Sequence, residues 1–340
     1  MNTQELSATA HALGAKNKGI LAADESNSTI KKRFDTIKLE CTEEARRTYR
    51  EMLFSAPGAQ EFISGVIMYD ETLRQKTKDG VPFPAYLAQH GMLPGIKVDT
   101  GAKPLAGFPG ETITEGLDGL RERLAEYYKM GAKFAKWRAV IDIGSGIPSR
   151  YAIETNAESL ARYAALCQEA GIVPIVEPEV LMDGAHTLER CEEVTNGVLD
   201  TVFEHLFAAR VYLEGIVLKP NMVIPGKKSP QKASPEQVAE ATLRTLKRQV
   251  PTAVPSIAFL SGGQSPTEAT LHLSLMNAAG PLPWALTFSY GRALQEDALS
   301  AWGGKPAGYS GGQKALFVRS KLNSLAVVGS YKPSMEASAA

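Results

Sequence analysis

The sequence predicts an α/β protein folded as a (β/α)8 TIM barrel. Eight short apolar runs alternate along the chain with longer segments in which apolar residues recur at helical spacing. The runs are almost continuously apolar, which is typical of parallel strands covered on both faces. A chain of 340 residues is within the size range of such barrels. The predicted strands span 19–24, 62–70, 95–99, 131–140, 172–180, 212–220, 256–264 and 284–291.

Local signals mark the helices between these runs. Apolar residues recur at helical spacing in 117–130, where Gly131 ends the helix, and the stretch 154–170 ends at Gly171 in the same way. Two further helices begin at capping boxes that carry proline at the first helical position. These are Ser234-Pro235-Glu236-Gln237 and Ser265-Pro266-Thr267-Glu268.

An open doubly wound sheet is the alternative architecture. It would require a glycine-rich dinucleotide turn after an early strand, and GxGxxG is absent there. No low-complexity linker, charge block or sequence repeat divides the chain. We therefore expect a single domain over residues 1–340, with a short C-terminal tail at about 331–340.

Composition excludes several classes of protein. The 37 basic and 37 acidic residues give zero net charge, so neither nucleic acid nor an anionic membrane is an expected partner. No apolar run reaches the length of a membrane span, the N-terminus lacks a signal-peptide core, and the odd cysteine count argues against a disulfide framework. We expect a cytoplasmic protein. The five histidines show no zinc-ligand spacing, so no metal and no other cofactor are expected.

Charged and hydroxyl side chains lie within or at the ends of the predicted strands. Buried strands rarely tolerate charge unless it is paired or functional. Because the carboxyl ends of all barrel strands converge on one pocket, an active site explains this pattern better than an isolated ion pair. The residues concerned are Asp24, Asp70, Lys97, Lys136, Arg138, Glu177, Glu179, Lys219, Ser261 and Arg292.

Lys219 is the candidate nucleophile. It follows Ile216, Val217 and Leu218 and precedes Pro220. Apolar neighbours strip an amine of hydration and favour its uncharged, nucleophilic form, which can form a Schiff base with a carbonyl. From this segment alone, a lysine paired with a carboxylate at a strand end is an equally good interpretation.

Neighbouring strands supply groups that could assist a lysine. Lys136 and Arg138 are two residues apart and so share a strand face, as do Glu177 and Glu179. A carboxylate beside a Schiff-base lysine can move protons during carbinolamine formation and dehydration. The alternative is that these four groups form two salt bridges. Asp24, at the end of the first strand, could accept a proton from a substrate hydroxyl or could cap a helix.

Two segments have features of phosphate-binding turns. The run 261–265 (SGGQS) ends the seventh strand and opens a helix, and 289–292 (SYGR) follows the eighth strand. Backbone N–H groups at a helix N-terminus can hold an anion, and the loops after strands seven and eight are the usual barrel phosphate site. The candidate ligands are Ser261, Gly262, Ser289, Gly291 and Arg292.

A third segment, 26–33 (SNSTIKKR), offers hydroxyls and three consecutive cations directly after the first strand. It is either a solvated charge run or a second phosphate site, which Lys97 could reach from the side. Two phosphate sites that flank a Schiff-base lysine would imply a bisphosphorylated sugar as substrate.

The sequence resembles the class I fructose-1,6-bisphosphate aldolases over nearly its whole length, from about residue 6 to Tyr331. The resemblance rests on blocks that occur in the same order in that family. These blocks are GILAADES, GIKVD, GETITEGLDGL, GAKFAKWR, GIVPIVEPEV, YLEGIVLKPNMV, FLSGGQS, PWALTFSYGRALQ and AWGG.

The resemblance implies a reaction and a role for each residue. It implies metal-independent, reversible cleavage of fructose 1,6-bisphosphate in glycolysis and gluconeogenesis, by a homotetramer. Lys219 would form the Schiff base, Glu177 would be the main acid and base with Glu179 beside it, Lys136 would assist, and Asp24 would take the C4 hydroxyl proton. The C1 phosphate would contact Ser261, Gly262, Gly291 and Arg292, and the C6 phosphate Ser26, Thr29, Arg33 and Lys97; Arg138 and Ser289 complete the candidate substrate-binding residues.

One feature departs from the family. Its well-known members carry a longer tail that ends in tyrosine and assists proton exchange at C3, whereas this sequence ends SYKPSMEASAA. Either another group carries this proton or the tail has been lost, and the preference for bisphosphate over monophosphate sugars stays open. A transaldolase-like Schiff-base enzyme and a scaffold protein on the same fold are the alternative functions.

Overall fold

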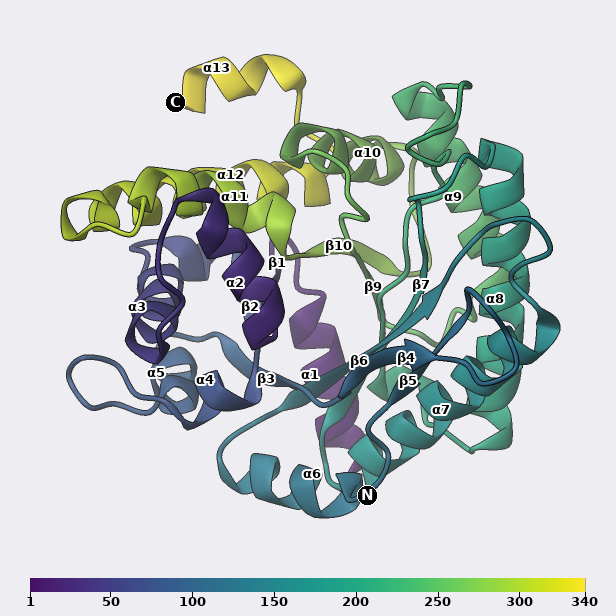
Figure 1. Ribbon diagram of the computed structural model, residues 1–340, viewed down its shortest axis with the longest axis horizontal. Helices are drawn as coiled ribbons and strands as arrows, with labels where there is room; N and C mark the ends of the chain where they lie inside the picture. Colours follow the sequence, from purple (N-terminus) through teal and green to yellow (C-terminus); the bar gives the residue numbers. More distant parts are fainter. Residues whose placement is uncertain (340) are drawn as a thin grey trace.

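The computed structural model describes residues 1–339 and confirms the predicted barrel (Figure 1). Eight parallel strands close in the order β1-β10-β9-β8-β7-β6-β3-β2. Residue 340, the last of the expected tail, lies outside the described residues. The barrel strands are β1 Gly19–Ala23, β2 Ile63–Met68, β3 Leu93–Lys97, β6 Phe134–Ile141, β7 Val173–Val180, β8 Val217–Leu218, β9 Ser256–Phe259 and β10 Ala285–Tyr290.

Every predicted run overlaps a barrel strand, but several bounds were wrong. The run 212–220 holds a 3-10 turn at Leu213–Gly215 followed by a strand of only two residues, β8. Asp70 does not end a strand beside the pocket. It begins helix α4, where its carboxylate accepts hydrogen bonds from Arg74 and from the Tyr127 hydroxyl (2.9 Å). The expectation that Asp70 supplies the charged group of the second strand end is therefore wrong, and Tyr69 lines the cavity there instead.

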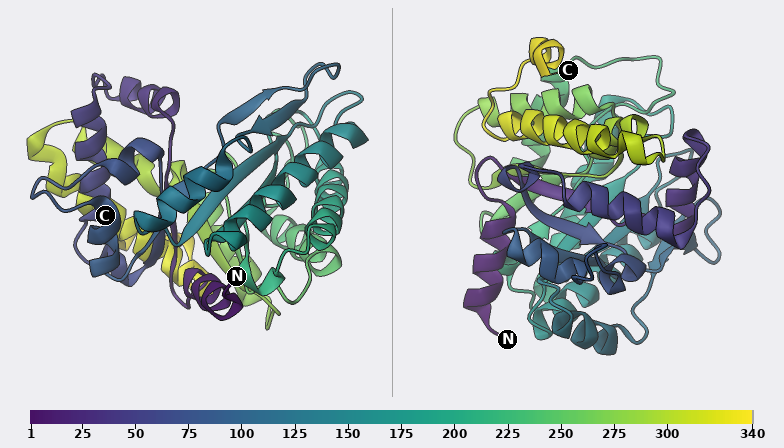
Figure 2. Two further views of the ribbon diagram at one scale, coloured as in Figure 1. Left: turned by 90° about the horizontal axis from the view of Figure 1, so that it is seen from below. Right: turned by 90° about the vertical axis from the view of Figure 1, so that its left-hand side faces the viewer.

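A two-stranded antiparallel hairpin between β3 and β6 was not predicted. It consists of β4 (Gly101–Pro104) and β5 (Thr112–Glu115). Its residues are largely exposed on β4, so the segment lacks the apolar pattern by which the barrel strands are recognised. The hairpin lies at one end of the barrel, opposite the end covered by the first helix (Figure 2).

Helices form the outer layer. Both predicted capping boxes are present: the Ser234 hydroxyl accepts a hydrogen bond from the Gln237 amide, and Ser265 does the same with Glu268. The helices are α1 Thr3–Leu13, α2 Asn27–Thr36, α3 Glu43–Phe54, α4 Asp70–Arg74, α5 Phe83–Gln89, α6 Leu120–Lys129, α7 Arg150–Glu169, α8 Leu188–Ala208, α9 Pro235–Gln249, α10 Pro266–Ala278, α11 Arg292–Trp302, α12 Tyr309–Val327 and α13 Glu336–Ala339.

The inside of the barrel changes from apolar to charged along β6, β7 and β8. Near the amino ends of the strands, Phe134, Ile175 and Val217 pack against Leu6 and Leu13 of α1, which closes that end. Side chains alternate between the two faces of a strand, so the next inward positions after these three residues are Lys136, Glu177 and Lys219. Because these apolar residues and α1 fill the amino end of the barrel, only the carboxyl ends of the strands are open to a ligand.

Candidate active site

A cavity of about 580 Å³ opens at the carboxyl ends of the barrel strands. All fifteen residues that the sequence predicted for the site contribute to its lining. They are Asp24, Ser26, Thr29, Arg33, Lys97, Lys136, Arg138, Glu177, Glu179, Lys219, Ser261, Gly262, Ser289, Gly291 and Arg292.

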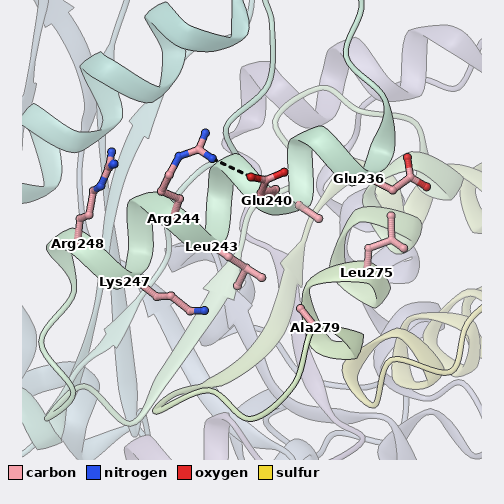
Figure 3. A pocket seen from close by; sticks show the side chains of 9 residues that line it. Glu236, Glu240, Leu243, Arg244, Lys247, Arg248, Leu275 and Ala279 are labelled. Atoms are coloured by element: carbon pink, nitrogen blue, oxygen red, sulfur yellow. Dashed lines mark hydrogen bonds and ion pairs between the residues drawn. The ribbon is translucent and has the colours of Figure 1, made fainter.

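A second hollow, also of about 580 Å³, lies between α9 and α10 (Figure 3). Arg244 points towards Glu240 there and also donates two hydrogen bonds, of 2.8 and 2.7 Å, to Glu192. None of the residues predicted for the site lines this hollow. The barrel cavity is therefore the candidate active site.

A chain of four alternating charges crosses the base of the cavity. The Lys219 ammonium lies 3.2 Å from Glu177 Oε1, and Lys136 Nζ lies 3.5 Å from Glu177 Oε2 and 2.8 Å from Asp24 Oδ2. Lys219, Glu177 and Lys136 are buried, with at most 4% of each residue exposed. Glu177 Oε2 is also buried and accepts no hydrogen bond from the described residues. An oxygen of this kind is available to bind a substrate hydroxyl or a water.

The two charges at the far end of this chain stabilise each other. Burial alone would raise the pKa of the Asp24 carboxyl, but the ammonium groups of Lys136 and Lys219 outweigh it and hold that pKa well below its usual range. Burial alone would lower the pKa of Lys136, but Asp24 and Glu177 raise it above its ordinary value. Asp24 is thus ionised at neutral pH, which is the form that can accept a proton.

Both salt bridges expected as the alternative are present, but only one of them is isolated. Arg138 pairs with Glu179, whereas Lys136 pairs with Glu177 and also with Asp24. Because Arg138 binds Glu179 directly, Glu179 is less available for proton transfer than Glu177.

Lys97 is also engaged. Its ammonium donates to the Asp99 carboxylate at 2.5 Å and to the Asp99 carbonyl at 2.6 Å. Asp99 in turn accepts from the Gly101 amide at 3.1 Å. The charge of Lys97 is therefore largely neutralised where it lines the cavity.

The turns after β9 and β10 form one face of the cavity. Gly262 and Gly263 have positive φ angles of 53° and 72°, which residues with a side chain adopt only with strain. The Arg292 guanidinium donates to the Gln264 carbonyl at 2.8 Å and so joins the two turns. Ser289 Oγ is buried and makes no hydrogen bond to the described residues. Helices α10 and α11 begin directly after these turns, which directs their N-termini towards the same region.

The predicted second phosphate segment forms the start of α2. Ser26 caps this helix without a side-chain capping bond, and its hydroxyl lies 3.1 Å from that of Ser28 and 3.2 Å from that of Thr29. Arg33, one turn further, pairs with Glu25. The hydroxyls and Arg33 are therefore brought to one wall of the cavity, as a phosphate site requires.

A model of the class-I fructose-bisphosphate aldolase family matches residues 5–340. The chain belongs to this family. A probable class 1 fructose-bisphosphate aldolase of Xanthomonas campestris is 56% identical over 333 residues, which cover 98% of this chain and all of the relative. A cytosolic fructose-bisphosphate aldolase of Arabidopsis thaliana is 54% identical over 98% of this chain and 85% of its own length.

A solved structure gives the same result. Fructose-bisphosphate aldolase from Plasmodium falciparum, determined in complex with TRAP and a small-molecule inhibitor, superimposes with a TM-score of 0.95 at 51% identity. The match covers 97% of this chain and 95% of that one. The comparisons confirm the family, the barrel fold and the lyase class expected from the sequence.

Twelve residues that line the cavity were not among those predicted for the site, and the ionisable ones are Glu25, Tyr69, Asp99 and Lys103. Glu25 follows Asp24 in AADES, and Asp99 is two residues from Lys97 in GIKVD, so a second charged residue at a buried strand end was an available signal. Tyr69 precedes Asp70 at the end of the predicted second strand, whereas Lys103 lies in a segment without such a pattern. In residues 1–339, no group of three or more His, Cys, Asp or Glu side chains could hold a metal ion.

Glu25 organises the wall below α2. It pairs with Arg33 and Arg50 and accepts a hydrogen bond of 2.9 Å from Gln295. Burial alone would raise the pKa of Glu25, but the two arginines outweigh it and lower the pKa below its ordinary value of 4.5. The stabilisation is present above the pKa of the unfolded chain and is lost as the pH falls through the lower, folded value.

We predict that Glu25→Gln destabilises the chain at pH 7, by about 3 kcal/mol or more, because two buried guanidinium groups lose their counterion. The difference in free energy of unfolding between the variant and the wild type should stay constant above about pH 6 and become smaller below about pH 4.5. Urea unfolding at a series of pH values measures both effects. Glu122→Gln, on an exposed face of α6, is the control. A difference that does not change with pH would contradict the role assigned to Glu25.

Proposed function

We propose that the chain is a metal-independent fructose-bisphosphate aldolase in which Lys219 forms a Schiff base with the C2 carbonyl of fructose 1,6-bisphosphate. The observation that carries the proposal is the position of Lys219. It is buried at the base of the cavity, 3.2 Å from Glu177, and the turns after β9 and β10 and the start of α2 line the same cavity.

Glu177 is proposed to move the protons of imine formation. It contacts both Lys219 and Lys136, so it can accept a proton from the amine before attack and return one to the leaving hydroxyl. The Lys219 nitrogen bonds to C2, the carbonyl oxygen leaves as water, and a protonated imine remains. Glu179, held by Arg138, is proposed to support the charge and orientation of this group.

Asp24 is proposed to act at the next step. The protonated imine accepts the electron pair of the C3–C4 bond as that bond breaks, and Asp24 takes the proton from the C4 hydroxyl. Glyceraldehyde 3-phosphate leaves, and the enamine is protonated at C3 and hydrolysed to dihydroxyacetone phosphate. Lys136 keeps Asp24 ionised and, when a substrate oxygen draws Lys136 away, Asp24 becomes a stronger base.

The two walls of the cavity are proposed to bind the two phosphates. Ser261, Gly262, Ser289, Gly291 and Arg292 would hold the C1 phosphate through backbone amides, hydroxyls and one guanidinium. The C6 phosphate would contact Ser26, Thr29, Arg33, Lys97 and Arg138, on the wall that runs from the start of α2 to β3 and β6. A second phosphate wall favours a bisphosphate substrate over the monophosphate of a transaldolase-like enzyme.

The proton donor at C3 of the enamine is not Tyr331 in this proposal. Its side chain is buried away from the cavity, and its hydroxyl donates to Glu336 at 2.7 Å. Arg319 holds the same carboxylate at 2.8 and 2.9 Å, which fixes the start of the tail against α12.

Three further expectations are part of the proposal. The barrel, its helices and the tail would form one domain, and the chain would act as a homotetramer. It would also be cytoplasmic, which the cytosolic Arabidopsis relatives support. No helix within residues 1–339 is long and apolar enough to cross a bilayer.

We predict that Lys219→Met lowers cleavage of fructose 1,6-bisphosphate at least about a thousandfold, because no other group can form the imine. Wild-type activity should survive EDTA. A coupled assay for triose phosphate, run on both proteins with and without the chelator, measures this. Activity retained by the variant, or lost by the wild type on chelation, would contradict the proposed chemistry. Fructose 6-phosphate serves as the test substrate for the transaldolase-like alternative.

We predict that Arg292→Ala raises the KM for fructose 1,6-bisphosphate about tenfold or more, since a charge-assisted hydrogen bond contributes roughly 1.5–3 kcal/mol. Arg162→Ala, which removes an exposed arginine outside the cavity, is the matched control. Steady-state kinetics give both values. An unchanged KM would remove Arg292 from the C1 phosphate site.

A further inference from the structure

We propose that Lys103, on the β4–β5 hairpin, binds the C6 phosphate and sets the preference for bisphosphorylated over monophosphorylated sugar. The inference rests on the proposed function and adds a residue to its distal phosphate site. Lys103 lines the cavity from strand β4, at the mouth of the barrel.

Lys103 differs from the other cations of the cavity in being unpaired. The other six are each within ion-pair distance of a carboxylate: Arg33 of Glu25, Lys97 of Asp99, Lys136 of Asp24, Arg138 of Glu179, Lys219 of Glu177 and Arg292 of Glu296. Within residues 1–339, the Lys103 side chain has no ion pair and no hydrogen bond. Its full charge is therefore available to an anion that enters the cavity.

The hairpin that carries Lys103 is fixed to the barrel. The Thr112 hydroxyl donates to the Val140 carbonyl at 3.1 Å, and the Thr114 hydroxyl donates to the Arg138 carbonyl at 2.8 Å. Asn156 of α7 donates to the Thr112 carbonyl at 2.8 Å and accepts from the Thr114 amide. These bonds hold β5, and through it β4, against β6, so the backbone of Lys103 has a defined place at the rim.

The order of strands places this rim opposite the C1 phosphate turns. The hairpin follows β3, and β3 is the fourth strand from β9 in either direction around the closed barrel. A substrate anchored by one phosphate at the turn after β9 and by its C2 carbon at Lys219 would extend its far end across the barrel. The far phosphate would then approach β3, β6 and the hairpin.

That side of the cavity otherwise has little free positive charge. Lys97 is neutralised by Asp99 at 2.5 Å, and Arg138 is bound to Glu179. A phosphate monoester brings about −1.5 to −2 charges at neutral pH. Lys103 is exposed, so the strength of its interaction with a phosphate depends on ionic strength. Lys97 and Arg138 are already paired with carboxylates, so Lys103 supplies the unpaired positive charge on this side of the cavity.

The experiment compares two substrates that differ at C6. Lys103→Met should lower kcat/KM for fructose 1,6-bisphosphate by about three- to tenfold, mainly by raising KM. This fold-change lies between the effect of losing an exposed ion pair and the effect of losing a charge-assisted hydrogen bond. Fructose 1-phosphate lacks the C6 phosphate, so its kcat/KM should stay within about twofold. Lys103→Arg should restore most of the selectivity. Lys129→Met, an exposed lysine of α6 outside the cavity, is the matched control.

The outcomes separate this inference from the proposed reaction. An unchanged ratio of the two kcat/KM values in Lys103→Met would overturn the role of Lys103, as would an equal change in Lys129→Met. Loss of fructose 1-phosphate cleavage to the same extent as bisphosphate cleavage would also overturn it. Failure of Lys219→Met to abolish cleavage would instead contradict the proposed Schiff base, and the substrate ratio would still decide the role of Lys103.

Discussion

The chain of charges from Lys219 through Glu177 and Lys136 to Asp24 is the constraint on which the rest of the structure depends. Four ionisable groups inside a barrel can carry charge only if each has an opposite charge nearby, because an unpaired buried charge is strongly unfavourable. The spacings of 3.2, 3.5 and 2.8 Å meet this requirement along the whole chain. Such ion pairs add little net stability, so the apolar layers must provide it.

The distribution of apolar residues follows from that requirement. Phe134, Ile175 and Val217 fill the amino-terminal half of the barrel with Leu6 and Leu13 of α1, and the charged positions begin one inward step later. This end of the barrel is therefore apolar and closed, while the other is polar and open. A substrate can approach Lys219 only from the side where the proposed phosphate-binding walls lie, so the same packing that stabilises the barrel would also orient the substrate.

The sequence predicted the barrel because near-continuous apolar runs and capping boxes are local signals, and it predicted the site because charge at the end of such runs is rare. It could not predict how the charges pair. Arg138 pairs with Glu179, and Arg33 and Arg50 share Glu25, through contacts between segments distant in the chain. Asp70 was misplaced because strand β2 ends two residues earlier, and a helix start accepts aspartate as readily as a strand end. The β4–β5 hairpin was missed because its exposed residues show no alternation. Lys103 was missed with it.

The most direct test of the account is chemical trapping of the proposed imine. The enzyme is incubated with dihydroxyacetone phosphate, reduced with borohydride, digested and analysed by mass spectrometry. Imine formation at the lysine paired with Glu177 predicts a single reduced adduct on the peptide that contains Lys219, and no adduct in Lys219→Met. An adduct on another lysine, or no adduct under conditions in which the enzyme turns over, would contradict it.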